Sequence, residues 1–517
     1  MDAKLGDSSI DVSHASITEN TEPAGGIKAL WREKHVMSLA LFSNLGGFLY
    51  GCVFSGILVM SNFERNFPPI TTDSVTMKGL VSSNSWSSEK FGRKQSISLA
   101  CAFAILGAAL QTGARNPAFF YVGRFFTGVG VGALSVGVPL YNTEISPSRI
   151  RGGLGSLFQL SVELGTFVAF WIDFGCNYIG GTAEGQTEAA WRIPMAIQLI
   201  PALILAVGIL FVPESPRWLI SRNRDEAARR ALVSLRQRPE DSKEVQMEYL
   251  QILGEHKFQQ ELGALEKGSE SDGFISSAWN QWTYLFRSAA NRKRVLVGVA
   301  LMFFQCWNGM NGILFYAPTI FQGLGLSGTT VSLLATGVVG AVMLIATLPT
   351  VLFLDQKPVL IFGALAMGVC HALIAGLSGK YEDSWESHKA AGWVACVFVW
   401  IFSALFAMSL GPVTWVITAG VKEWRIAGSS SWLNAFAVSM ATPPMLESLK
   451  FGTYIFFGAW CFVAAAFCVF IPETAGRSLE DMDAAFGDTS RTSEQDQERM
   501  NRINHEIGYD KYQDTKF

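Results

Sequence analysis

Long runs of apolar residues dominate this chain and fall into two blocks. The first block extends from about residue 36 to 212, and the second from about residue 295 to 471. Each run has the length of about 20 residues that a helix needs to cross a hydrocarbon core about 30 Å thick. Only helices and closed barrels satisfy every backbone hydrogen bond in lipid. The pattern therefore predicts an all-α membrane protein.

Composition supports a membrane protein and excludes other classes. Of the 517 residues, 50% are apolar and 16% are charged, whereas soluble domains carry about 25% charged residues. The net charge of −3 gives no reason to expect a nucleic-acid partner, so the expected partner is the lipid bilayer. The cysteines have no metal-ligand spacing, and no nucleophile–base set or phosphate loop is present. We therefore expect no enzyme activity, no cofactor and no metal.

The apolar runs predict five spans in the first block and six in the second. They cover residues 36–60, 96–114, 119–142, 154–174 and 193–212, then 295–320, 329–354, 358–378, 391–418, 428–449 and 451–471.

Lysine and arginine in the loops predict the orientation. The segment 213–294 is rich in both, so we expect a cytoplasmic helical linker there. Counting spans forward places the tail, residues 472–517, in the cytoplasm as well. Arg32 and Lys34 favour a cytoplasmic N-terminus. Residues 1–30 and the end of the tail are polar enough to be disordered.

The start of the first block conflicts with this orientation. Arg93 and Lys94 also belong on the cytoplasmic side, yet a single apolar run separates them from Lys34. A return crossing should lie between Asn62 and Lys90, but part of that stretch is too polar and too short for an ordinary span. Either the N-terminus lies outside, or a span is missing.

Matching motifs end the two blocks and suggest an internal repeat. Pro213–Arg217 ends the first block and Pro472–Arg477 ends the second, as expected of two transporter halves around a central site. Further motifs are Gly123, Arg124, Gly128 and Gly130; Glu144, Pro147, Arg151 and Gly152; Gln305 to Pro318; and Gly411, Pro412 and Trp415. Between Trp31 and Gly487, the chain resembles the sugar porter family of the major facilitator superfamily, and fungal monosaccharide transporters in particular.

The resemblance implies a fold of two pseudo-symmetric six-helix bundles. Here the bundles would cover residues 31–212 and 295–471, with the second of twelve spans missing. It implies a plasma-membrane transporter, expected to be a monomer, that moves a hexose or pentose by alternating access, with or without a proton. Quinate, inositol or galacturonate are alternative substrates. A transporter-like sugar sensor and a mis-spliced or decayed paralogue are alternative functions.

A sugar site needs amide groups and an aromatic ring in an otherwise apolar cavity. Gln159, Gln305, Asn311 and Trp415 match sugar-contacting positions of the family. Asn308 follows Gln305 at i+3 and so shares its helix face. For Gln305 and Asn308, the alternative is hydrogen bonding that holds helices together.

Charged residues near the ends of the spans form a second set. In the family, such residues make inter-helix salt bridges that hold the outward-facing state and break during alternating access. The matching positions are Arg93, Arg124, Glu144, Arg151, Glu214, Arg217, Glu473 and Arg477. Glu163 is an unusual acid inside an apolar run, either a proton site or a locally paired group. His371 is expected to be structural.

The chain departs from the family at positions that concern coupling and binding. The first span reads Tyr50-Gly51-Cys52 and lacks the aspartate that family members use for proton coupling. Cys306 stands where a second amide is usual, and Ser431 stands where an asparagine is usual. Symport and uniport therefore both stay open.

Overall fold

The computed structural model describes most of the chain. The described residues are 33–52, 57, 60–67, 92–147, 150–181, 185–266, 289–325, 328–352, 356–381, 384–385, 387–419, 424–471 and 491–509. In these ranges every regular element is a helix, and nine helical stretches are long and apolar enough to cross a membrane. The prediction of an all-α membrane protein is confirmed.

The first half and the linker are built as follows. The helices are α2 (Lys34–Ser43), α3 (Leu45–Gly51), α4 (Ser61–Asn66), α6 (Arg93–Thr112), α7 (Pro117–Ile145), α8 (Arg151–Cys176), α9 (Ala189–Ile197), α10 (Leu199–Gly208), the short 3-10 turn η6 (Ile209–Phe211), α11 (Pro216–Ser221), α12 (Asp225–Arg236) and α13 (Lys243–Glu266).

The second half and the tail follow. Their helices are α15 (Ala289–Trp307), α16 (Met310–Gly323), α17 (Thr329–Leu352), α18 (Gln356–Tyr381), α19 (Lys389–Met408), α20 (Leu410–Ala419), α21 (Trp424–Ser448), α22 (Gly452–Val469) and α24 (Arg491–Glu506). Each apolar run singled out in the sequence thus contains helix. The end of the tail was expected to be disordered, but residues 491–506 form helix α24.

Several predicted spans are broken helices. The first is divided at Asn44, whose side-chain oxygen accepts a hydrogen bond of 2.7 Å from Asn142 of α7. The break between α15 and α16 occurs at Gly309, where φ is +95°, a backbone conformation that suits glycine. The break between α19 and α20 occurs at Ser409. Broken helices expose backbone groups inside the bundle, where they can bind side chains or substrates.

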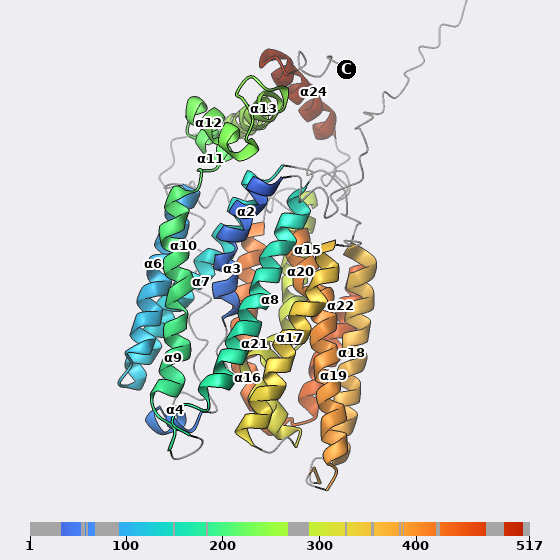
Figure 1. Ribbon diagram of the computed structural model, residues 1–517. Coiled ribbons are helices and arrows are strands. Elements are labelled where there is room, and N and C mark those ends of the chain that lie inside the picture. Colours follow the sequence, from blue (N-terminus) through green and yellow to red (C-terminus); the bar gives the residue numbers. More distant parts are fainter. Residues whose placement is uncertain are drawn as a thin grey trace, which may run out of the picture.

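The linker helices define one end of the molecule. Figure 1 shows α11, α12 and α13 beyond one end of the bundle, which we call the linker end, and α4 at the opposite, far end. Helix α2 begins at Lys34 near α12, and Gly92, which precedes α6, lies against Glu214 and Trp218. Asn62 of α4 is hydrogen-bonded to Gln186 at the far end.

This arrangement removes the conflict in the predicted orientation. Lys34 and Arg93 lie at the same end, so the alternative in which the two lie on opposite sides is wrong. Phe67 lies at the far end among aromatic side chains, and Gly92 lies at the linker end. The connection between them, where the missing span was expected, falls on residues 68–91, outside the described residues.

The linker helices and the tail helix share a hydrophobic cluster. Side chains of α11, α12 and α13 form this cluster, and Ile507 and Tyr509, after α24, pack against it. Arg502 of α24 pairs with Glu261 of α13 at 2.7 Å. Ile503 is buried. An apolar stripe on a strongly polar helix explains why α24 is folded although its composition suggests disorder.

Glycines allow α3 to lie against α8 in close contact. A Cβ atom on Gly51 would lie 1.9 Å from the carbonyl oxygen of Val162, and one on Gly165 would lie 2.2 Å from that of Phe48. The hydroxyl of Thr166 donates to the carbonyl of Gly51 at 3.0 Å. In lipid, small residues let helix backbones approach in this way. The contact fixes Tyr50 of α3 next to the middle of α8.

The second contact of α8 joins the two halves. Helix α8 packs along α17, and Figure 1 shows the two side by side in the centre of the molecule. A Cβ atom on Gly340 of α17 would lie 2.9 Å from the Cα atom of Phe167. Helix α8 is therefore held between the first span and the second half.

Replacing Gly165 with alanine should destabilise the protein, because the added methyl group would overlap the backbone of α3. Overpacking of this kind costs about 1–3 kcal/mol. Gly175→Ala, on the same helix, is the matched control, since a Cβ atom there has no neighbour within 4 Å. At position 175 the change should not destabilise the protein, because alanine favours the helical conformation over glycine by about 1 kcal/mol.

The measurement is the melting temperature of each variant in detergent micelles. We expect Gly165→Ala to melt at a lower temperature than the unmodified protein, and Gly175→Ala to melt at the same or a higher temperature. Equal melting temperatures for the two variants would contradict the close α3–α8 contact.

Candidate functional site

A layer of polar and aromatic side chains lies where the two halves meet. Trp432 of α21 donates from Nε1 to the hydroxyl of Ser135 on α7 at 3.0 Å. The ring of Trp432 also meets that of Tyr50 on α3 edge to face, with centroids 5.2 Å apart. The indole of Trp432, in the second half, thus joins α21 to α3 and α7 of the first half. The contacts lie inside the bundle, since Ser135 and Trp432 are both buried.

Helix α8 contributes an amide and an acid to this layer. Gln159 and Glu163 are one helical turn apart, and Nε2 of Gln159 donates to Oε1 of Glu163 at 2.6 Å. Both side chains are buried. Tyr50 lies within electrostatic range of Glu163 and of Cys306 on α15. Tyr50 thus interacts with this acid of the first half and with a thiol of the second half.

The second half presents amides, a thiol and an aromatic ring. Gln305 of α15 donates to the carbonyl of Gly411 on α20 at 3.0 Å. The thiol of Cys306 donates to the carbonyl of Ser431 on α21 at 3.4 Å and also interacts with the side chain of Asn311 on α16. Trp415 is half-buried on α20, which packs against α8. Four of the predicted binding residues thus lie on helices that surround the layer.

Asn308 has a different environment. Its side chain donates to the carbonyl of Gln305 at 2.7 Å and accepts from the backbone N–H of Met310 at 2.8 Å. Its own carbonyl lies 2.8 Å from Nε2 of the buried His371. The amide of Asn308 thus holds the break between α15 and α16. This is the alternative to sugar binding, in which Asn308 makes hydrogen bonds that hold helices together. His371 supports the same break, as expected.

Charged residues form a network at the linker end. Arg93 of α6 pairs with Glu144 of α7 at 2.7 Å, and both side chains are largely buried. The carboxylate of Glu214 accepts from the backbone N–H groups of Arg93 and Lys94 at 3.1 and 3.4 Å. It therefore occupies the N-terminus of α6, a favourable position for an anion. Burial raises the pKa of Glu214, and these N–H groups oppose the rise.

The other predicted gating residues are distributed more widely. Arg217 of α11 pairs with Glu255 of α13 at 2.9 Å, which holds the linker helices together. Arg124 lies in α7 toward the far end, over the ring of Phe120, and interacts electrostatically with Asp173. The side chain of Arg151 and the whole of Glu473 and Arg477 lie outside the described residues.

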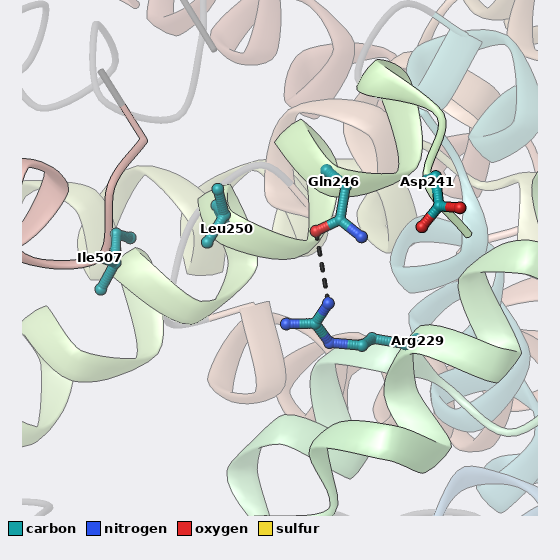
Figure 2. Close-up of a pocket in the computed structure, with 5 residues that line it drawn as sticks. All are labelled: Arg229, Asp241, Gln246, Leu250 and Ile507. Atoms are coloured by element: carbon teal, nitrogen blue, oxygen red, sulfur yellow. Dashed lines mark hydrogen bonds between the residues drawn. The ribbon is translucent and has the colours of Figure 1, made fainter. Parts of the chain in front are cut away.

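A cavity of about 460 Å³ lies elsewhere, among the linker helices. Figure 2 shows its residues, with Arg229 joined to Gln246 by a hydrogen bond of 3.3 Å. Arg229 also lies over the ring of Tyr249 at 4.1 Å, so its guanidinium is already engaged. This cavity is remote from the polar layer. Within the described residues, no group of His, Cys, Asp and Glu is placed to hold a metal.

Tyr50, Ser135 and Trp432 are not among the site residues that the sequence predicts. Hydroxyls and aromatic rings are common in membrane helices, so these residue types alone do not predict a binding site. One signal was present, because the departures from the family pattern include Tyr50-Gly51-Cys52, Cys306 and Ser431. Those departures lie in or directly beside the layer.

Comparisons with known proteins agree with this architecture. A family model described as "Sugar (and other) transporter" matches residues 76–486. A "Probable quinate permease" of Aspergillus niger is 34% identical over 424 residues, which cover 77% of this chain and 74% of that protein. "High-affinity glucose transporter 1" of Candida albicans is 29% identical, with coverage of 87% and 85%.

A solved structure of the same architecture is also similar. The major facilitator proton:xylose symporter XylE bound to 6-bromo-6-deoxy-D-glucose superposes with a TM-score of 0.71 at 25% identity, covering 88% of this chain and 99% of that one. The fold is therefore that of the major facilitator superfamily, and the resemblance seen in the sequence is confirmed. The chain belongs to the sugar (and other) transporter family of membrane proteins.

Proposed function

We propose that this protein carries a neutral monosaccharide across a membrane by alternating access. The observation that carries the proposal is the polar layer between the halves, which combines amides, hydroxyls and indoles in an otherwise apolar bundle. A sugar has a ring of hydroxyls that need donors and acceptors, and an apolar face that packs on aromatic rings. In this proposal, Gln159, Gln305, Asn311, Trp415 and Trp432 contact the sugar.

Quinate is the second candidate substrate. The matched relatives include a protein named as a probable quinate permease, and quinate shares the polyhydroxylated ring of a sugar. Quinate, however, is a carboxylate, and the acid in the layer is Glu163. Two carboxylates at one site repel each other unless one holds a proton. Helices α17 and α20, which pack against α8, also carry no cation that could pair with the carboxylate of quinate, so the layer favours a neutral sugar in either protonation state of Glu163.

The linker-end network is proposed to act as the gate. Arg93, Glu144 and Glu214 join α6, α7 and the start of the linker in the described conformation. The network lies within the first half, so it would act by holding the linker end of that half in the shape against which the second half moves. Lysines and arginines concentrate at this end, so we place it in the cytoplasm. We further propose a plasma-membrane location and a monomer.

The first test is uptake of radiolabelled D-glucose, D-xylose, inositol, galacturonate and quinate in a transporter-null yeast that expresses this chain. We expect uptake of a neutral monosaccharide that saturates and exceeds uptake of quinate. Surface expression is measured in parallel. Correct surface expression without uptake of any of these compounds would contradict transport and favour a sensor or an inactive paralogue.

Replacing Trp432 with alanine should weaken substrate binding. The change removes the hydrogen bond to Ser135 and the contact with Tyr50. Those contacts hold the indole in place, and the packing of an aromatic ring against the sugar is worth about 1 to 1.5 kcal/mol, so we expect the KM to rise by about tenfold. Leu433→Ala is the matched control, because that side chain is 62% exposed on the same helix. Equal KM values for the two variants would place Trp432 outside the substrate site.

Replacing Arg93 with alanine should lower the rate of uptake without a comparable change in surface expression. Glu144 then loses its partner in a largely buried site, which leaves an uncompensated charge in the conformation that the pair holds. We expect an initial rate reduced by about tenfold or more. Arg238→Ala breaks the exposed pair with Glu244 and serves as the control. A charge swap, Arg93→Glu with Glu144→Arg, should recover part of the rate if the pair itself matters.

A further inference from the structure

Glu163 is an acid in the middle of a membrane-spanning helix. Helix α8 runs from Arg151 to Cys176, so Glu163 lies about 18 Å from its start at about 1.5 Å per residue. The residue is 1% exposed. Oε1 accepts from Gln159 at 2.6 Å, whereas Oε2 is buried without a hydrogen-bond partner among the described residues. A transmembrane acid in this position is expensive unless it serves a function.

No described cation neutralises Glu163. Of the helices packed against α8, α17 and α20 contain no charged residue at all. Tyr50 is the titratable group that α3 turns toward Glu163, and Cys306 of α15 lies beyond it.

Charged groups of the remaining neighbours are engaged elsewhere. On α7, Glu144 pairs with Arg93, and Arg124 interacts with Asp173 nearer the far end of α8. On α9, Arg192 pairs with Glu188. The two titratable residues of α2, Lys34 and His35, lie at its linker-end start.

We propose that Glu163 binds the coupling proton of this transporter, in the place of the acid that the first span lacks. The inference rests on the proposed function and extends it to the energy source. An ionised carboxylate without a cation partner is costly to bury, whereas a carboxylic acid can donate one hydrogen bond and accept another. Binding one H⁺ at Oε2 converts the first state into the second.

Proton binding at Glu163 is linked to the sugar site through two contacts. Gln159 bonds to Oε1 and belongs to the proposed sugar contacts, and Tyr50 interacts electrostatically with Glu163 and packs edge to face on Trp432. One H⁺ adds to the carboxylate while the site is open to the outside, and the same H⁺ leaves when the site opens to the inside. The net result is one proton moved with one sugar, with no bond made or broken in the sugar.

The structure also explains why Glu163 is available for this role. Glu144 is held by Arg93 and Glu214 by backbone N–H groups, whereas Asp173 of the same helix as Glu163 interacts electrostatically with Arg124. Glu163 lies one helical turn from Phe167, which packs against Gly340 of the second half, so a change between outward and inward access alters its surroundings. An acid that binds and releases a proton in each cycle needs such a change.

The test uses purified full-length protein in liposomes with radiolabelled D-glucose, or the neutral sugar that gives the highest uptake in the yeast panel. Two reactions are measured for each variant. Counterflow, the exchange of labelled for unlabelled sugar, requires alternating access but no proton gradient. Accumulation against a gradient requires coupling and is driven here by an inward pH gradient. The variants are Glu163→Gln, which keeps the shape and the bond from Gln159, and Glu163→Asp, which keeps the acid.

Glu188→Gln, which removes a carboxylate paired with Arg192 away from the layer, is the control. The unmodified protein should accumulate sugar several-fold above equilibrium and lose this accumulation with a protonophore. Glu163→Gln should retain counterflow, lose accumulation and lose the dependence of uptake on external pH. Glu163→Asp should retain accumulation with a shifted pH profile, and Glu188→Gln should remain coupled.

Three outcomes would overturn the inference while the proposed function stands. The first is accumulation by Glu163→Gln at the level of the unmodified protein. The second is an unmodified protein that performs counterflow but never exceeds equilibrium. The third is loss of counterflow in Glu163→Gln, which would make Glu163 a structural or sugar-binding residue. Absence of counterflow in the unmodified protein would instead defeat transport itself.

Discussion

The close contact of α3 with α8 is the constraint on which the central site depends. The backbone of one helix lies where a side chain would otherwise be, at Gly51 against Val162 and at Gly165 against Phe48. This contact sets the position of Tyr50, and through Tyr50 the position of Trp432 from the other half. Helix α8 also packs along α17, so one helix connects the first span with the second half.

Broken helices supply the second half of the site with backbone groups. Gln305 bonds to the carbonyl of Gly411, just after the break at Ser409, and Asn308 holds the break before Gly309. Free backbone carbonyls are costly in lipid unless they are buried within protein. Placing them between helices lets a small number of amide side chains satisfy them. The same groups can exchange partners when the halves move.

The sequence predicts the helices of this fold better than it predicts the site. Long apolar runs identify the spans because lipid leaves the backbone no alternative to helix. The breaks at Asn44 and Ser409 have no comparable signal, since neither residue interrupts an apolar run by itself. The bond between Ser135 and Trp432 joins residues 297 positions apart, and no local pattern specifies such a pairing. Helix α24 depends on its contact with α13, so composition alone suggested disorder.

The distribution of charge within the described first half follows one physical rule, and Glu163 departs from it. At the linker end, where water is near, acids are matched by Arg93 or by the N-terminus of α6. In the middle of the bundle, where a pair would gain most from the low dielectric, Glu163 has a single amide partner. A purely structural acid at that depth would be replaceable by glutamine or leucine at a gain in stability. Keeping a carboxylate there makes sense where its two protonation states are both used, and the junction of the two halves is where such a difference can be converted into movement.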